Sequence, residues 1–124
     1  FILRELLEPV RLQYDYVIID CPPSLGLLTL IALSSSDMVI IPLQTEFLAM
    51  QGLAKIKQVI QKVKLRLNKK LTIGGVLATM FDSRKVLNRD VIETIQKYFG
   101  DLDYKTRIRD NVALAEAPAQ SKKI

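Results

Sequence analysis

Apolar residues along the chain follow two different spacings, and these alternate. Short runs rich in β-branched residues are typical of strands buried on both faces of a parallel sheet. Longer stretches with an apolar residue at every third or fourth position are typical of helices. The short runs predict strands at 16–20, at 38–41, within 71–80 and near 104–108. The spaced stretches predict helices at 1–13, 27–33, 47–67 and 88–99. This order predicts an α/β fold with a mainly parallel sheet and flanking helices.

Individual residues indicate where the elements end. Pro42 is expected to stop the second strand, and Asn88 is a candidate N-cap of a helix that Gly100 ends. Gly74 and Gly75 lie in the third strand, where they indicate a bulge or the close approach of a neighbour. The residues expected on the buried sides of the two long helices are Ala49, Leu53, Ile56, Ile60, Val63 and Leu67, then Leu87, Val91, Ile95 and Phe99.

Length and composition limit the chain to one domain at most. With 124 residues, 49% of them hydrophobic, it can bury a core. No apolar run approaches the roughly 20 residues that cross a bilayer. The lack of histidine excludes Ser-His-Asp and Cys-His nucleophile pairs, and the single Cys21 fits a reducing cytosol. Because the chain starts at Phe1 and its tail has no natural ending, we expect part of a domain, truncated at both ends.

The stretch 14–26 carries the first candidate site. Asp20 directly follows the first predicted strand, and a turn containing two prolines and Ser24 leads to Gly26. Ligands of open α/β sheets bind outside the carboxyl ends of strands, so we expect Asp20 to face a ligand crevice. Mg²⁺ is often held by one or two carboxylates together with nucleotide phosphates. The alternative is that Asp20 merely ends a strand and the prolines mark an ordinary turn.

The string Asp-Cys-Pro-Pro-Ser-Leu-Gly-Leu-Leu-Thr-Leu after Tyr-Asp-Tyr resembles the Walker B and switch II segment of the ParA/Soj/MinD ATPases, which are deviant P-loop NTPases. The ParA/Soj branch, which partitions chromosomes and plasmids, is the most similar. The resemblance covers all 124 residues and implies the carboxyl-terminal part of one such ATPase domain. It implies that Asp20 supports Mg²⁺ and that Ser24 and Gly26 belong to a catalytic switch that senses the γ-phosphate of ATP.

Other segments resemble nucleotide-contacting parts of the same family. Residues 42–47 resemble its Pro-x-Gln-x-Glu segment, although Thr45 or Glu46 can equally cap the next helix. Residues 79–82 and 111–118 resemble segments that wrap the adenine base. The nucleotide-binding residues implied by this resemblance are Pro42, Gln44, Glu46, Met80, Phe81, Asp82, Asn111 and Glu116.

A basic run adds a candidate surface to a chain whose formal net charge is +5. Residues 47–81 contain no Asp or Glu, and their cations are Lys55, Lys57, Lys62, Lys64, Arg66, Lys69 and Lys70. One interpretation is a solvated helix face with lysine stems lying on apolar surface. The other is an electrostatic footprint for phosphate backbones. The resemblance implies DNA binding without sequence preference, by an ATP-bound dimer.

The chain departs from the family at one place with structural consequences. Its 124 residues contain no Lys-Gly-Gly-x-Gly-Lys-Thr phosphate loop, which would cradle the nucleotide phosphates. In the family's sheet, the strand before that loop lies between the strands expected at 16–20 and 38–41. We therefore expect the sheet to close abnormally, or another chain to fill the gap. We also expect little or no ATPase activity from these residues alone.

The resemblance implies a function for the whole protein. ATP binding closes a homodimer, the dimer binds DNA on the cytoplasmic nucleoid, and hydrolysis stimulated by a ParB-like partner releases it. One alternative is a MinD-like, membrane-associated ATPase in cell-division placement. Another is a nucleotide-free interaction module that uses the basic helix.

Overall fold

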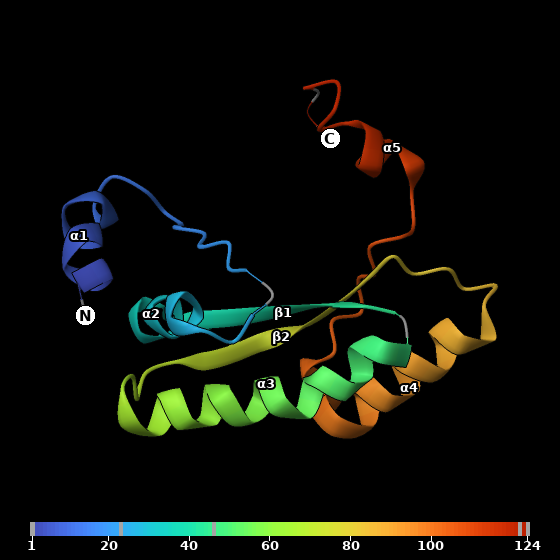
Figure 1. Ribbon diagram of the computed structural model, residues 1–124, viewed down its shortest axis with the longest axis horizontal. Helices are drawn as coiled ribbons and strands as arrows, with labels where there is room; N and C mark the ends of the chain where they lie inside the picture. Colours follow the sequence, from blue (N-terminus) through green and yellow to red (C-terminus); the bar gives the residue numbers. More distant parts are fainter. Residues whose placement is uncertain (1, 23, 46, 122, 124) are drawn as a thin grey trace. The chain divides into compact units, whose positions relative to one another are not determined.

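The computed structural model describes residues 2–22, 24–45, 47–121 and 123, and within 47–51 it describes the backbone alone. In chain order the elements are α1 (Ile2–Arg11), α2 (Leu27–Ser35), β1 (Met38–Gln44), α3 (Phe47–Arg66), β2 (Thr72–Thr79), α4 (Val86–Phe99), the 3-10 helix η1 (Gly100–Leu102) and α5 (Val112–Glu116) (Figure 1). None of the described helices is long and apolar enough to cross a membrane.

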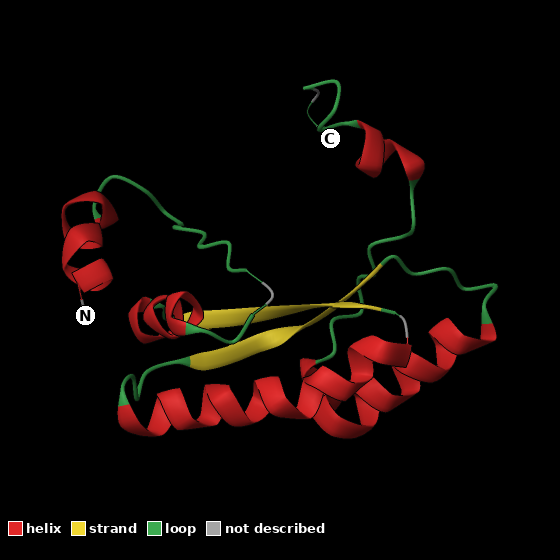
Figure 2. Ribbon diagram, in the orientation of Figure 1, coloured by secondary structure: helices red, strands yellow, loops and turns green. Residues whose placement is uncertain are grey.

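The elements divide between two compact units. Unit 1 comprises Phe1–Val39 and Gln51–Gly74, and unit 2 comprises Ile40–Met50 and Gly75–Ile124. The strands β1 and β2 are hydrogen-bonded neighbours that run in the same direction and pass through both units (Figure 2). The predicted α/β fold with a parallel sheet and flanking helices is therefore confirmed, and the carboxyl ends of both strands belong to unit 2.

Strand β1 continues through Pro42, which we had expected to stop it. Just beyond the strand, Thr45 N–H donates to the carbonyl of Thr79 at 3.2 Å. Successive residues of a strand alternate in direction, so the backbone nitrogen of Pro42 points away from β2. Proline's missing N–H thus removes no hydrogen bond to β2. Exposed and buried residues alternate along much of β1, so the prediction that both faces are buried is wrong.

The predicted strand at 16–20 is wrong. In the described chain these residues belong to a loop between α1 and α2, and Tyr16 and Ile18 are 86% and 91% exposed. A strand forms stably when a neighbouring strand pairs with its N–H and C=O groups. The phosphate-loop strand expected beside 16–20 is not in this sequence, and among the described residues no strand pairs with 16–20.

Helices α1, α2 and α3 form where the sequence predicts them, but α1 and the first turn of α2 bury little. Helix α1 has no buried residue among those described, and it contacts α2. In α2, Ala32 and Leu33 are buried, whereas Leu27 and Leu28 in its first turn are exposed. Helix α3 buries Leu53, Ile60 and Val63 of its predicted stripe, while Ile56 is half-buried and Leu67 beyond its end is 44% exposed. The side chain of Ala49, also predicted to be buried, lies outside the described part of the chain.

A buried amide joins the carboxyl ends of α2 and α3 within unit 1. Asn68 follows α3, and its side chain is 4% exposed. Its Nδ2 donates to the carbonyls of Leu33 and Ser36 at 3.0 and 2.7 Å. Helices leave their last carbonyls without intrahelical partners, so Asn68 satisfies groups of α2 that burial would otherwise penalise.

In unit 2, residues 103–109 follow β2 along its second edge. The N–H groups of Tyr104 and Ile108 donate to the carbonyls of Val76 and Ala78 at 3.0 and 2.9 Å. The pairing consists of isolated parallel bridges, so the predicted fourth strand forms in part only.

The chain departs from β2 between these bridges, and two contacts accompany the departure. Arg107 folds back on Asp103, with Nη2 and Oδ2 2.7 Å apart. The Tyr104 ring lies against Gly75, where a Cβ would be 2.5 Å from the ring and 2.8 Å from the carbonyl oxygen of Leu102. The close approach predicted from the glycine is therefore confirmed at Gly75.

Helix α4 begins at Val86, two residues before the predicted N-cap Asn88, so that prediction is wrong. Its buried residues are Asn88, Val91, Ile95 and Phe99. Leu87, predicted to be buried, is 48% exposed. Gly100 ends the helix as predicted, and its positive φ of +54° is one that glycine adopts without steric cost.

We predict that Gly75→Ala destabilises the protein by about 1–3 kcal/mol, because the new methyl group must displace a ring and a backbone carbonyl. The matched control is Gly52→Ala in α3, where a Cβ meets nothing within 4 Å. That substitution should stabilise the helix by about 0.5–1 kcal/mol. Urea unfolding midpoints measure both effects, and equal shifts of one sign would contradict the close approach at Gly75.

Candidate functional site

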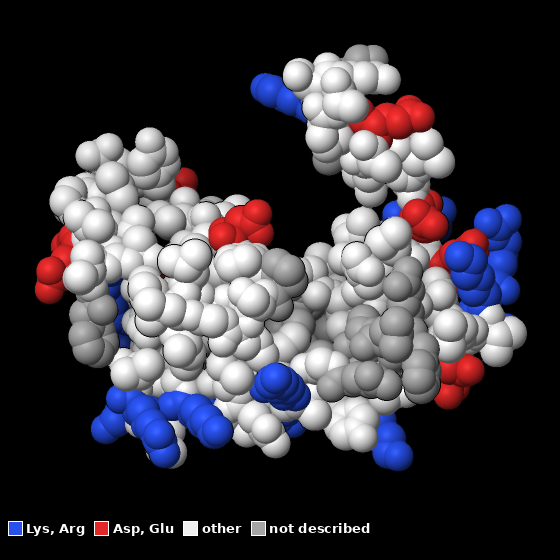
Figure 3. Space-filling view, in the orientation of Figure 1, with Lys and Arg blue, Asp and Glu red and all other residues white. Residues whose placement is uncertain are grey.

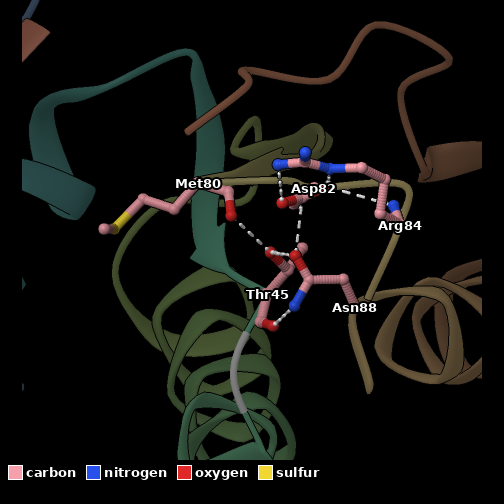
Figure 4. Close-up of polar contacts among 5 residues, drawn as sticks. All are labelled: Thr45, Met80, Asp82, Arg84 and Asn88. Atoms are coloured by element: carbon pink, nitrogen blue, oxygen red, sulfur yellow. Dashed lines mark hydrogen bonds and ion pairs between the residues drawn. The ribbon is translucent and has the colours of Figure 1, made fainter. Parts of the chain in front are cut away.

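Thr45 and Asn88 form a buried polar cluster at the carboxyl ends of the strands in unit 2 (Figure 4). Thr45 is 0% exposed, and its hydroxyl lies 3.0 Å from the carbonyl oxygen of Met80. Asn88 Nδ2 donates to the Thr45 carbonyl at 2.8 Å, and Asn88 Oδ1 accepts from Asp82 N–H at 2.8 Å. The cluster therefore ties the end of β1, the turn after β2 and the first turn of α4 to one another.

Met80, the first residue after β2, has a left-handed backbone with φ +52°. Methionine carries a Cβ that disfavours this region, so the conformation needs support from its surroundings. The Met80 side chain is 44% exposed. The turn thus holds an apolar, partly exposed side chain directly outside a strand end, where α/β sheets place their ligands.

Asp82 continues this turn and binds Arg84. The Arg84 guanidinium meets both carboxylate oxygens, with Nε 3.0 Å from Oδ1 and Nη2 2.9 Å from Oδ2, and Arg84 N–H also donates to Oδ1. The Arg84 side chain lowers the pKa of Asp82 to about 2, with its backbone N–H adding to the effect. In return, the Asp82 carboxylate raises the pKa of Arg84. Asp82 is therefore ionised and held in a fixed orientation.

The second predicted adenine segment begins beside the first. Phe81 N–H donates to the Ile108 carbonyl at 2.9 Å, and Asp110 N–H donates to the Phe81 carbonyl at 3.2 Å. Asn111 then caps α5, with Oδ1 accepting from Ala113 N–H at 2.8 Å. The structure therefore places 80–82 beside 108–110, the residues that directly precede the predicted segment 111–118.

The other residues predicted to bind the nucleotide are exposed or lie outside the described part of the chain. Pro42 and Gln44 are exposed residues of β1, and Glu116 is exposed on α5. Glu46 lies outside the described residues. Thr45, considered as a helix cap, instead uses its hydroxyl to join the buried cluster.

The predicted switch residues belong to the loop of unit 1. Asp20, Ser24 and Gly26 are exposed, and the Ser24 carbonyl accepts from the hydroxyl of Thr29 at 2.7 Å. Gly26 immediately precedes α2. Among the described residues, no group of three or more acidic, cysteine or histidine residues could hold a metal ion. A single exposed carboxylate fits Mg²⁺ that is held jointly with phosphate oxygens, and Asp20 is such a group.

The basic run lies mainly on exposed surface of unit 1. Lys55, Lys62 and Arg66 are exposed on α3, and none of the ion pairs among the described residues includes them. Lys64, Lys69 and Lys70 are also exposed, whereas Lys57 is half-buried and has an interaction partner. Figure 3 shows basic side chains gathered along the edge of the molecule that α3 forms in this view. The exposed cations are thus available to a negatively charged partner.

Comparison with known proteins identifies the class. The model of a family described as an AAA domain matches residues 1–73. A solved structure of cobyrinic acid a,c-diamide synthase from Mycobacterium smegmatis, with bound ADP and magnesium, superposes with a TM-score of 0.80 at 32% identity. That superposition covers 98% of this chain and 55% of the synthase. The fold is therefore that of an α/β nucleotide-binding ATPase domain.

Two curated relatives define the family more narrowly. Sporulation initiation inhibitor protein Soj of Bacillus subtilis is 52% identical over 122 residues, 98% of this chain and 48% of Soj. Chromosome partitioning protein ParA of Myxococcus xanthus is 47% identical over 124 residues, 100% of this chain and 44% of ParA. The chain belongs to the ParA/Soj family of partitioning ATPases, as its sequence predicted. It spans about half the length of these relatives.

Sequence reasoning missed the roles of Asn88 and Arg84. Asn88 had a detectable signal, because it occupies the same side of α4 as the buried residues Val91 and Ile95. A polar residue in a buried stripe requires a hydrogen-bonding partner, which indicates a specific contact. Arg84 offered no such signal, because an arginine in a turn is ordinarily solvated.

We predict that Arg84→Gln raises the pKa of Asp82 from about 2 toward its ordinary 3.8. The stabilisation from a lowered carboxyl pKa is complete above the ordinary value and is lost as the pH falls through about 2. The variant should therefore lose less stability over this acidic range. Carboxyl ¹³C NMR titration measures the pKa, with Arg89→Gln on α4 as the control. Identical Asp82 titrations in the protein and both variants would refute the contact.

Proposed function

We propose that this chain is part of a ParA/Soj-like ATPase that partitions chromosomes or plasmids. The observation that carries the proposal is identity of about half the residues, along the whole chain, to proteins named for chromosome partitioning or as Soj. In this proposal ATP binding favours a dimer, the dimer binds DNA without sequence preference, and a ParB-like partner stimulates hydrolysis and release.

In the proposed site, the carboxyl edge of unit 2 binds the nucleotide base. Backbone groups of 79–82 and 108–110 contact the base edge, and the partly exposed Met80 side chain covers an apolar face. The fixed Asp82 carboxylate keeps the turn in shape through Arg84. When bound, ATP with Mg²⁺ supplies the phosphoryl group and the charge that neutralises its phosphates. Considered by itself, the exposed Asp20 of unit 1 would serve as one carboxylate ligand of an Mg²⁺ ion that phosphates also bind.

The proposed DNA surface is the exposed basic face of α3 with the lysines after it. Lys55, Lys62 and Arg66 follow one another along the same side of the helix. No acid occurs in residues 47–81, so this surface attracts phosphates without local competition. Because lysine and arginine heads recognise phosphates in any sequence, such a surface supports binding without sequence preference.

We predict that Lys55→Gln, Lys62→Gln and Arg66→Gln each weaken DNA binding by the longer protein to a similar extent on unrelated DNA sequences. Each should also reduce the slope of log affinity against log salt by about one unit, because binding with one phosphate contact fewer releases about one counterion fewer. Fluorescence anisotropy across a salt series measures both effects. Lys97→Gln on α4 is the matched control, and variants that bind like this control would return the basic run to a solvated helix face.

We also predict that the 124 residues alone hydrolyse ATP no faster than background, because the sequence holds no phosphate loop. A phosphate-release assay on the purified chain, with circular dichroism as a check on folding, measures this. A full-length ATPase of the family serves as the positive control. Hydrolysis by the chain that disappears in Asp20→Ala would overturn the prediction.

A further inference from the structure

We propose that Thr45 and Asn88 are positioning residues, which hold Met80 in its left-handed conformation and lock the end of β1 to the turn 79–82. Neither side chain is exposed to a ligand, since Thr45 is 0% and Asn88 5% exposed. They act through the backbone of the turn. The consequence for ligand binding rests on the proposed nucleotide site, whereas the conformational part stands on the geometry alone.

The orientation of the Asn88 amide is fixed by two backbone groups. Asp82 N–H is a donor, so the amide atom that it meets at 2.8 Å is the oxygen. The Thr45 carbonyl is an acceptor, so the amide atom facing it at 2.8 Å is the nitrogen. Asparagine is the right length to satisfy both groups at once, and a flipped amide would oppose donor to donor and acceptor to acceptor. Asn88 therefore sets the distance between the end of β1 and the turn.

The Thr45 hydroxyl completes the arrangement with its single proton. The hydroxyl oxygen lies 3.1 Å from the Thr79 carbonyl oxygen, 3.0 Å from that of Met80 and 3.1 Å from Asn88 Oδ1. The Thr79 carbonyl already accepts from Thr45 N–H, and Asn88 Oδ1 accepts from Asp82 N–H. The Thr45 hydroxyl therefore donates its proton most favourably to the carbonyl of Met80, which is the closest of the three acceptors.

That hydrogen bond supports an otherwise unfavourable backbone. At φ +52° the methionine Cβ crowds its own backbone, and an extended conformation is the ordinary alternative for a residue after a strand. Relaxation of Met80 would turn its carbonyl away from the Thr45 hydroxyl. It would also redirect the N–H of Phe81, which pairs with Ile108. The two candidate base-contacting segments would then lose their common register.

A conformational experiment tests the positioning role without any ligand. Thr45→Val keeps the side-chain shape but removes the hydroxyl, Thr45→Ser keeps the hydroxyl, and Thr94→Val removes an exposed hydroxyl on α4 as the matched control. We expect the ¹³Cα and ¹³Cβ shifts of Met80 to report a left-handed residue in the unsubstituted protein, in Thr45→Ser and in Thr94→Val. We expect that signature to be lost in Thr45→Val. Its persistence there would overturn the proposal.

A second pair of variants keeps the test decisive if Thr45→Val does not fold. Met80→Gly and Met80→Ala both remove the side chain, but glycine adopts positive φ without steric cost whereas alanine does not. We therefore expect Met80→Gly to have a higher unfolding midpoint than Met80→Ala. In an extended backbone the order reverses, because glycine is then the less stable residue, and that reversal would overturn the left-handed assignment.

The consequence for the nucleotide is measured in the longer protein that carries a phosphate loop. We expect Thr45→Val to reduce the ratio of ATP to GTP affinity by about tenfold, while Thr45→Ser and Thr94→Val keep the ratio of the unsubstituted protein. An unchanged ratio in Thr45→Val, in a protein that prefers ATP, would overturn the positioning role and leave the proposed function intact. An unsubstituted protein without preference for ATP would instead overturn the proposed base site, and with it this consequence.

Discussion

Hydrogen bonding along both edges of β2 is the interaction on which the structure of unit 2 depends. Val76 and Ala78 are fully buried, and their carbonyls accept from Tyr104 and Ile108, while Thr79 at the end of the strand accepts from Thr45 on the opposite edge. A buried backbone group without a partner costs free energy, so β2 needs neighbours on each side. By meeting that need, the neighbours bring the two candidate base-contacting segments together outside its carboxyl end.

Two buried asparagines hydrogen-bond elements that backbone pairing does not connect. Asn68 in unit 1 ties the end of α3 to the last carbonyls of α2, and Asn88 in unit 2 ties α4 to the ends of both strands. An amide offers donors and an acceptor in one plane, so it can satisfy two backbone groups of different elements. Apolar packing alone tolerates small shifts, whereas these bonds are lost when the elements move. The position of the candidate site therefore depends on the buried Asn88 behind the turn 79–82 as well as on the residues of the turn.

The charges divide into paired and unpaired groups with different consequences. Asp82 with Arg84 and Asp103 with Arg107 form short ion pairs in unit 2, and both pairs shape a turn next to β2. Within the Asp103–Arg107 pair the side chains are 3% and 15% exposed, so removing one partner would leave a buried charge. The exposed cations Lys55, Lys62 and Arg66 take no part in the ion pairs of the described residues. Paired charges here serve structure, and the exposed cations suit a negatively charged partner.

The sequence by itself determined the family, β2 and the long helices α3 and α4, because local periodicity and the string after Asp20 are properties of consecutive residues. Tertiary structure decided the features that need contacts with residues distant in sequence. Residues 16–20 have the composition of a strand, but no strand in the described part of the chain pairs with them, so they remain a loop. Asn88 looks like a helix cap, yet its hydrogen bonds reach Thr45, 43 residues away. No local pattern encodes such a contact, because it exists only after β1 and α4 have been brought together.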